Sequence, residues 1–204
     1  MVRAKPMRRT LDLRPGEWVE VRSFDEILST LDERGELDAM PFMPEMEAYC
    51  GKRFMVSRRA DKSCDRVQRS GLRRMSDVVH LEDLRCDGSS HGGCQALCLL
   101  FWKEQWLRRV SDSLPLASRV VPSRIDRAGL LHAVRKPEQS ASEEPAWSCQ
   151  ATEAFRASTR IPPWDLSHYI RDMRCGQTTL WRVLWWGATT TLNKIQGHAI
   201  LLGR

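Results

Sequence analysis

The chain has little of what a membrane-spanning or nucleotide-binding protein needs. Its uncharged run from Val183 to Asn193 is about half the length that a bilayer span requires. No G-x-x-x-x-G-K-S/T, G-x-G-x-x-G, H-E-x-x-H or G-x-S-x-G motif occurs in the 204 residues. A hydrophobic content of 42% beside 28% charged residues excludes a fibre, a mostly disordered chain and a polytopic membrane protein.

An even set of cysteines is also missing, because the chain has seven and they cannot all form disulfides with one another. No basic, apolar and small-residue signal peptide opens the chain. We therefore expect a cytoplasmic protein, and in that reducing compartment clustered cysteines indicate metal or redox chemistry.

The net charge of +6 conceals two opposed blocks. Residues 17–47 are mainly acidic, whereas residues 52–74 are mainly basic. The basic block is suited either to a phosphate-bearing partner or to a solvated hairpin that faces its acidic neighbour. No aromatic residue lies between positions 55 and 74, so the stacking platforms of a nucleic-acid binder are missing and nucleic acid is not expected as a partner.

The pattern of elements predicts an α+β fold. Strands are expected at residues 18–21, 53–58 and 77–84, and a capping box from Ser23 to Glu26 opens a helix that should end at Gly35. Short strands with one inserted helix predict a small SH3-like β-barrel over residues 15–134, after a basic flexible leader at 1–14.

The second half of the chain is predicted to be mainly helical. CQALCLLFWKEQWLRRV, residues 94–110, has apolar residues on two sides of a helix, which predicts a buried helix after a cysteine-rich loop. Residues 135–146 read as a linker or mobile loop. Residues 147–204 read as a helical, tryptophan-rich extension, of which 177–204 either packs on the domain or contacts a membrane surface.

Three thiols and an imidazole lie close together in Cys86-Asp-Gly-Ser-Ser-His-Gly-Gly-Cys94-Gln-Ala-Leu-Cys98. Glycines let this backbone wind closely round an ion, and a second Cys-Gln-Ala follows the linker. The sequence therefore predicts a metal site with preferred ligands Cys86, Cys94, Cys149 and Cys98, and with alternates His91, Cys64 and Cys50.

The identity of the metal stays open between an iron–sulfur cluster, favoured by the cysteine-dominated set near an apolar segment, and zinc. The spacing is neither that of a zinc ribbon nor that of a ferredoxin. Two other interpretations remain. Cys98 and Cys175 could be buried apolar residues with His91 solvated, or Cys94 beside His91 could be an activated nucleophile.

Three blocks in order resemble a family of uncharacterised bacterial proteins. They are GEWVEVRSFDEILSTLDERGELDAMPFMPEMEAYCGKRF, RCDGSSHGGCQALCLLFWKEQWLRRV and CQATEAFRAST. The resemblance implies a short SH3-like module followed by a cysteine-containing FWKE-WL helix. It also implies cysteines at Cys50, Cys86, Cys94 and Cys149, and a place among biosynthetic genes.

These observations predict a cysteine-ligated metal protein that acts as a redox or metal-dependent accessory, or as an enzyme, in a bacterial biosynthetic pathway. The alternative is a zinc-stabilised interaction module that docks a partner protein or a membrane surface. A thiol enzyme that uses Cys94 with His91 is a third hypothesis.

Overall fold

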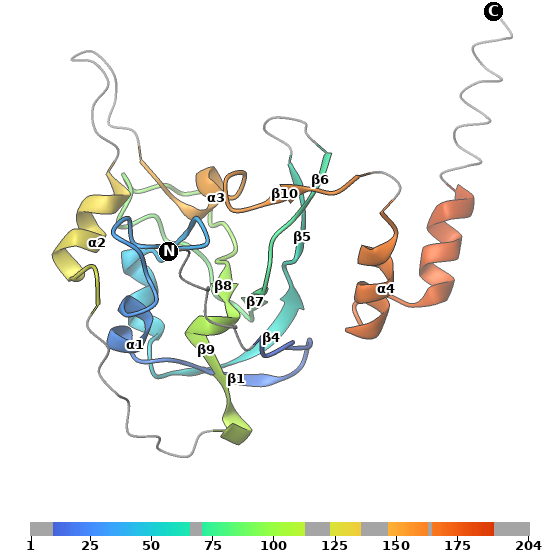
Figure 1. The fold of residues 1–204 in the computed structure, drawn as a ribbon, viewed down its shortest axis with the longest axis horizontal. Coiled ribbons are helices and arrows are strands. Elements are labelled where there is room, and N and C mark those ends of the chain that lie inside the picture. Colours follow the sequence, from blue (N-terminus) through green and yellow to red (C-terminus); the bar gives the residue numbers. More distant parts are fainter. Residues whose placement is uncertain (1–9, 66–70, 113–122, 136–146, 163–164, 190–204) are drawn as a thin grey trace, which may run out of the picture. The chain divides into compact units, whose positions relative to one another are not determined.

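The computed structural model describes residues 10–65, 71–112, 123–135, 147–162 and 165–189. The chain separates into two compact units, Met1–Ile161 and Pro162–Arg204 (Figure 1). Most of the predicted linker at 135–146 lies outside the described residues.

The first unit has the predicted α+β character, with antiparallel sheets and short helices. Its elements are, in chain order, β1 (Trp18–Val21), α1 (Phe24–Leu28), β2 (Glu36–Leu37), β3 (Met40–Pro41), the 3-10 helix η1 (Pro44–Tyr49), β4 (Arg53–Arg59), β5 (Lys62–Asp65), β6 (Gly71–Arg74), β7 (Val78–Leu81), β8 (Trp102–Lys103), η2 (Glu104–Trp106), β9 (Leu107–Arg109), η3 (Val110–Asp112), α2 (Arg127–Val134), α3 (Gln150–Glu153) and β10 (Thr159–Arg160). The second unit contains α4 (Ser167–Arg174) and a helix over residues 180–189.

Five strands form the main sheet, in the order β8-β7-β4-β1-β9. The two edge strands are consecutive in the chain, because only η2 separates β8 from β9. Four peptide steps span at most about 14 Å, so both edges lie close together and the sheet is strongly curled. Among the described residues, the edge strands β8 and β9 do not pair with each other, so closure into the predicted barrel stays a prediction.

Two smaller sheets complete the first unit: β10-β6-β5 and the hairpin β2-β3. The predicted basic block falls on β4, β5 and β6. Arg73 of β6 is buried, and its guanidinium carbon lies 3.9 Å from the centroid of the Phe155 ring. Part of the basic block therefore packs inside the fold.

The predicted capping box is present. The Ser23 hydroxyl accepts a hydrogen bond from the Glu26 N–H at 3.3 Å, and the Glu26 carboxylate accepts one from the Ser23 N–H at 3.0 Å. The helix that it opens ends at Leu28, earlier than Gly35. The predicted strands at 18–21 and 53–58 correspond to β1 and β4, and β7 lies within 77–84.

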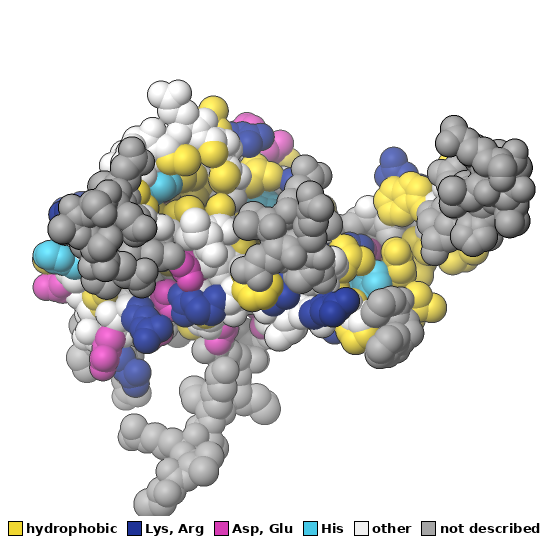
Figure 2. Space-filling view, turned by 90° about the horizontal axis from the view of Figure 1, so that it is seen from above, with side chains coloured by type: hydrophobic (Ala, Val, Ile, Leu, Met, Phe, Trp, Pro, Cys, Tyr) yellow, Lys and Arg dark blue, Asp and Glu magenta, His cyan; other side chains and the backbone are white. Residues whose placement is uncertain are grey.

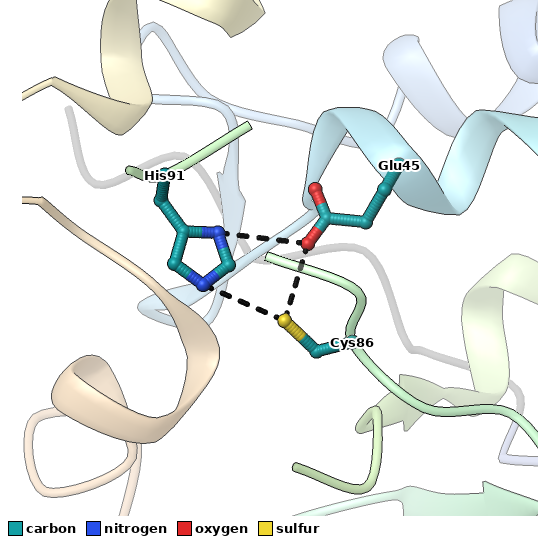
Figure 3. Close-up of side chains that lie close together, drawn as sticks. All are labelled: Glu45, Cys86 and His91. Carbon is teal, nitrogen blue, oxygen red and sulfur yellow. Dashed lines mark hydrogen bonds and ion pairs between the residues drawn. The ribbon is translucent and has the colours of Figure 1, made fainter. Parts of the chain in front are cut away.

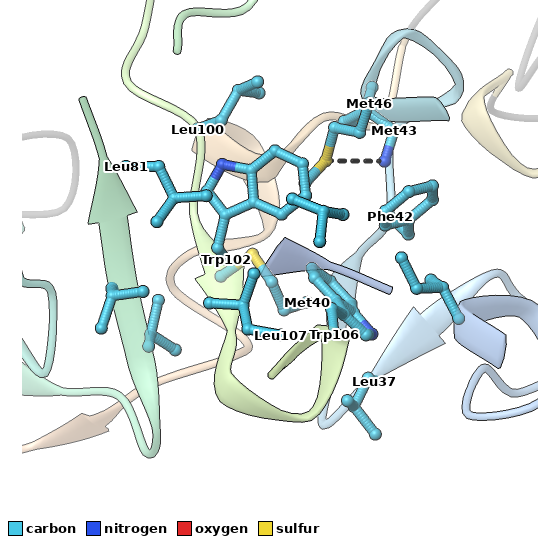
Figure 4. Close-up of a cluster of buried hydrophobic side chains, with 14 of the residues drawn as sticks. Leu37, Met40, Phe42, Met43, Met46, Leu81, Leu100, Trp102, Trp106 and Leu107 are labelled. Atoms are coloured by element: carbon cyan, nitrogen blue, oxygen red, sulfur yellow. Dashed lines mark hydrogen bonds between the residues drawn. The ribbon is translucent and has the colours of Figure 1, made fainter. Parts of the chain in front are cut away.

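Large apolar side chains from separate segments fill the core (Figure 4). The ring of Phe42 packs edge-to-face against two tryptophans, with its centroid 5.2 Å from that of Trp106 and 6.4 Å from that of Trp102. Met46 turns its sulfur back onto the N–H of Met43 at 3.3 Å, which folds the start of η1 against this cluster.

The predicted buried helix at 94–110 is wrong. The segment is a loop to Phe101, followed by β8, η2 and β9. Trp102 and Leu107 are buried because Trp102 pairs with Val79 of β7 and Leu107 pairs with Val21 of β1. These partners are remote in sequence, so helical periodicity was a poor guide.

A buried ionic cluster holds the start of the described chain to the sheet. The Glu104 carboxylate accepts hydrogen bonds from three consecutive backbone N–H groups, those of residues 11–13, at 2.7–3.1 Å. Arg59 donates to Glu104 at 2.8 Å, to Asp61 at 2.6 Å and to the Leu13 carbonyl at 2.7 Å. Every group in the cluster therefore has a partner, which offsets the cost of burying the charges.

Glu104→Gln is expected to lower the free energy of unfolding by about 3–5 kcal/mol, because it leaves the buried Arg59 charge partly uncompensated. Urea denaturation of the full chain measures this loss. The control is Glu17→Gln, which removes the partly exposed pair with Arg109 and should cost less than about 1 kcal/mol. Equal losses in the two variants would contradict the role assigned to Glu104.

Candidate metal centre

A closed loop carries two of the candidate ligands. The N–H of Cys86 donates to the Cys98 carbonyl at 2.8 Å, which joins the two ends of the loop. Within it, the Gly88 carbonyl accepts from the N–H groups of His91 at 3.1 Å and Gly93 at 3.0 Å. This turn brings the His91 side chain back towards Cys86.

Gly88 is required at this turn for two reasons. Its φ of +74° lies in the left-handed region, and a Cβ there would lie 2.1 Å from the carbonyl oxygen of Cys94. The glycine-rich sequence thus winds the backbone tightly, as expected, but it wraps the Cys86–His91 pair and leaves Cys94 outside.

The third side chain comes from η1, where Glu45 follows Pro44 at the first turn. Figure 3 shows Glu45, Cys86 and His91 pointing towards one another. The Cys86 Sγ lies 3.5 Å from Glu45 Oε1 and 3.5 Å from His91 Nε2, and His91 Nδ1 lies 3.7 Å from Glu45 Oε1. All three side chains are buried, with 5% of the Glu45 and His91 side chains exposed.

The electrostatics of this group favour a cation. Burial raises the pKa of the Cys86 thiol to about 12; the backbone N–H of Gly88 opposes the rise, and the charge and hydrogen bond of Glu45 add to it. Burial also raises the pKa of Tyr49, with further contributions from the charges of Asp87, Glu45 and Cys86. Glu45 forms no ion pair with a lysine or arginine among the described residues, so its carboxylate lacks a compensating positive side chain.

His91 leaves one polar atom unpaired. Its Nδ1 is buried without a hydrogen-bond partner among the described residues, since Glu45 at 3.7 Å is beyond hydrogen-bond reach. An orphaned buried nitrogen costs about 1–3 kcal/mol, so the direct hydrogen bonds in this group do not fully satisfy the imidazole. The Ser90 hydroxyl donates to the other carboxylate oxygen of Glu45 and holds that side chain in place.

The two distances from the Cys86 sulfur to the other donors fit a single tetrahedral ion. Ligand bonds of about 2.3 Å to sulfur and about 2.0–2.1 Å to nitrogen or oxygen place neighbouring ligands about 3.5 Å apart. Both distances from the Cys86 sulfur, to Glu45 Oε1 and to His91 Nε2, are 3.5 Å. A thiol, an imidazole and a carboxylate together form a donor set that zinc accepts.

Cys149 lies close to this group without belonging to the three-donor set. It is half-buried, and its charge contributes to the raised pKa of Cys86. The indole nitrogen of Trp147 would lie 2.7 Å from a Cβ at Gly92, so the segment containing Cys149 packs directly on the loop.

Gln150 fixes this segment from the inside. Its buried amide donates to the carbonyls of Pro41 at 3.0 Å and Phe101 at 2.9 Å, and accepts from the Phe101 N–H at 2.8 Å. The downstream Cys-Gln-Ala block therefore joins Pro41 of β3 to Phe101, the residue that precedes β8. Its glutamine is a structural link beside a candidate ligand.

The other predicted ligands lie elsewhere. Cys94 and Cys98 are exposed, and Cys50 is half-buried after η1, where burial and then the charge of Glu47 raise its pKa to about 11. The Cys64 side chain is outside the described residues. Of the predicted set, Cys86 and His91 are thus brought together, with Cys149 nearby.

Glu45 was missed by sequence reasoning. It lies 41 residues before Cys86 in a stretch rich in proline and methionine, where neighbouring acids indicate only a solvated face. Pro44 at the start of a 3-10 helix is a local signal for that helix, but no local signal connects the helix with the glycine-rich loop.

The preference for an iron–sulfur cluster is not supported. Within the described part of the chain, no set of cysteines gathers as a cluster requires, because Cys94 and Cys98 face solvent while Cys86 is buried. The three convergent donors instead suit a single ion.

The geometry also argues against a thiol enzyme based on Cys94. Cys94 lies in the loop instead of starting a helix, so no helix dipole stabilises its thiolate. His91 turns its Nε2 to Cys86, not to Cys94, and Cys86 is buried with a raised pKa, which disfavours the nucleophilic thiolate form.

An open cleft of about 460 Å³ adjoins the group. It is lined by Glu45 and by residues of η1, the loop and α2, namely Pro44, Glu47, Ser89, Ser90, Arg127, Leu130 and Leu131. Arg127 of α2 donates to Glu47 of η1 at 2.7 Å. The cleft thus offers hydroxyls, an ion pair and an apolar wall beside one of the three donors.

Comparisons with known protein families, with curated proteins and with solved structures find no match to this chain. The family resemblance described above therefore stays a prediction, and the candidate centre has to be judged by its geometry.

In metal-free protein, Cys94 and Cys98 should react with iodoacetamide at neutral pH far faster than Cys86. The raised pKa of Cys86 lowers its thiolate fraction at neutral pH, and burial hinders the reagent further, whereas the side chains of Cys94 and Cys98 are exposed. Peptide mass spectrometry after timed alkylation measures the order. Early modification of Cys86 would contradict the described environment.

Proposed function

We propose that this protein binds one zinc ion through Cys86, His91 and Glu45 and acts as a zinc-dependent enzyme or accessory. The observation that carries the proposal is the convergence of three buried donors of different chemistry on one point. The mixture of thiol, imidazole and carboxylate favours zinc over the hard cations magnesium and calcium, which prefer oxygen ligands.

A ligand set of three side chains is typical of catalytic zinc sites, whereas structural sites have four. Zinc held in this way supplies a Lewis acid and a bound water of lowered pKa. In this chain, Ser90 would orient the Glu45 carboxylate, and the cleft beside Glu45 would admit the molecule acted upon. Zinc does not change its oxidation state, so the redox role falls away.

The second candidate is a zinc-stabilised interaction module with Cys149 as a fourth ligand. The proximity of Cys149 to Cys86, and the packing of Trp147 on Gly92, favour it. A four-ligand site would join the loop to the downstream segment and stabilise the fold without leaving a position for substrate.

An SH3-like barrel is the fold that we infer for the first unit. Its support is the connection between the edge strands, since the three-residue η2 between β8 and β9 brings the two sheet edges together. The place in a bacterial biosynthetic pathway is also proposed, and it rests on the family resemblance alone.

Cys86→Ser is expected to abolish zinc binding, because serine is a poor ligand for zinc at neutral pH. The matched control is Cys94→Ser in the same loop, which should retain one zinc per chain since Cys94 is exposed. Elemental analysis after dialysis gives the stoichiometry. Loss of zinc from the control, or retention in Cys86→Ser, would overturn the ligand set.

Cys149→Ser separates the two candidates. A three-ligand site keeps its zinc with at most a small loss of affinity, whereas a four-ligand site loses zinc affinity and thermal stability together. Competition with a chromophoric chelator, combined with thermal melting of the holoprotein, distinguishes the outcomes.

Zinc binding should release a proton from Cys86 at neutral pH, because its raised pKa keeps the free thiol protonated. The logarithm of the zinc association constant should then rise by about one for each pH unit from about pH 7 to 9 without levelling. Titration calorimetry in buffers of different ionisation enthalpy measures the released proton. A plateau near pH 8.5 would indicate a thiol with an ordinary pKa.

A further inference from the structure

The helix at residues 180–189 in the second unit exposes large apolar side chains. Leu180, Trp181, Leu184 and Trp185 are each 56–73% exposed. At 100° per residue these four fall within one face of about 140°, so they form a continuous apolar stripe. Figure 2 shows yellow apolar side chains at the surface of this unit.

Exposure on this scale is unfavourable in water. Covering one large apolar side chain contributes about 1.5–3 kcal/mol, and contiguous apolar patches mark surfaces that bind something. The side chain of Val183, on another side of the helix, is less exposed than this stripe. Four of the largest apolar side chains of the helix are thus among the residues that it leaves in solvent.

The charge around the stripe is of one sign. After Asp172 the sequence contains no acidic residue, whereas it contains Arg174, Arg182, Lys194 and Arg204. A second copy of the chain would bring like charges together, which opposes self-association through this face. An anionic surface would instead be attracted to it.

The sequence of this segment is typical of a surface-bound helix. Arg182 and Lys194 bound the uncharged run from Val183 to Asn193, which is about half the length that a bilayer span requires. No helix among the described residues is long and apolar enough to cross a bilayer. Tryptophan suits the boundary between headgroups and acyl chains, because its ring is apolar and its N–H is polar.

We propose that the helix at 180–189 binds the surface of anionic phospholipid bilayers. Its apolar stripe enters the headgroup boundary, while Arg182, on another flank of the helix, meets lipid phosphates. This binding is independent of the metal centre, since the apolar stripe and Arg182 both belong to the second unit.

The test is flotation of the full-length protein with vesicles of phosphatidylcholine mixed with phosphatidylglycerol, and with vesicles of phosphatidylcholine alone. The protein should float with the anionic vesicles and only weakly with the neutral ones. Raising the salt concentration should weaken binding to the anionic vesicles, because it screens the attraction.

The double variant Trp181→Ser/Trp185→Ser should bind at least about tenfold more weakly, because it removes two large apolar side chains that would otherwise enter the bilayer surface. Trp18→Ser is the matched control, since Trp18 is a similarly exposed tryptophan on β1 of the first unit and should leave binding unchanged. Arg182→Gln should reduce binding to anionic vesicles only.

Circular dichroism and thermal melting establish that each variant is folded. The proposal is overturned if the folded wild type fails to float with anionic vesicles at low salt. It is equally overturned if Trp18→Ser abolishes binding as completely as the double variant. A third contrary outcome is a dimer in sedimentation equilibrium that the double variant no longer forms, because a second copy would then cover the stripe.

Discussion

The carboxylate of Glu104 connects the parts of the first unit on which the remaining structure depends. It lies on η2, between the two edge strands of the main sheet, and it binds the backbone of residues 11–13 and the guanidinium of Arg59. Arg59 ends the long central strand β4 and also pairs with Asp61. Because these charges are removed from water, their arrangement is stable only when every partner is present. The cluster therefore fixes the curl of the sheet and, with it, the ends of the strands from which the loop 86–98 projects.

The candidate centre combines three independent pieces of packing on that frame. Gly88 closes the loop so that His91 returns to Cys86, Met46 folds η1 onto the aromatic core so that Glu45 projects beside them, and Gln150 holds the downstream segment in place. The result is a buried thiol, imidazole and carboxylate without a lysine or arginine paired to them among the described residues. Such a group is costly in a medium of low dielectric constant, and a divalent cation would offset that cost. The same feature that makes the group unfavourable when empty makes it a good site for an ion.

Local signals in the sequence predicted part of this correctly. The capping box at Ser23 was readable because its two hydrogen bonds join residues three apart. The loop donors Cys86 and His91 were also readable, since they lie only five positions apart in the sequence, with Gly88 between them. Glu45 was not, because its proximity to Cys86 depends on packing between segments 41 residues apart. The predicted helix at 94–110 failed for the same reason, as β8 and β9 are stabilised by hydrogen bonds to strands far away in the chain.

By itself, the sequence determined the α+β character, the strands at 18–21 and 53–58, and the chemistry of a tight loop rich in cysteine, histidine and glycine. These follow from short-range patterns, in which a residue's neighbours in the chain are also its neighbours in space. Only the tertiary structure decided which donors meet: Cys86 and His91 with Glu45, while Cys94 and Cys98 remain in solvent. The physical reason is that burial and the closing of the loop are set by remote contacts, which select one side of the loop to face the core and leave the other side in water.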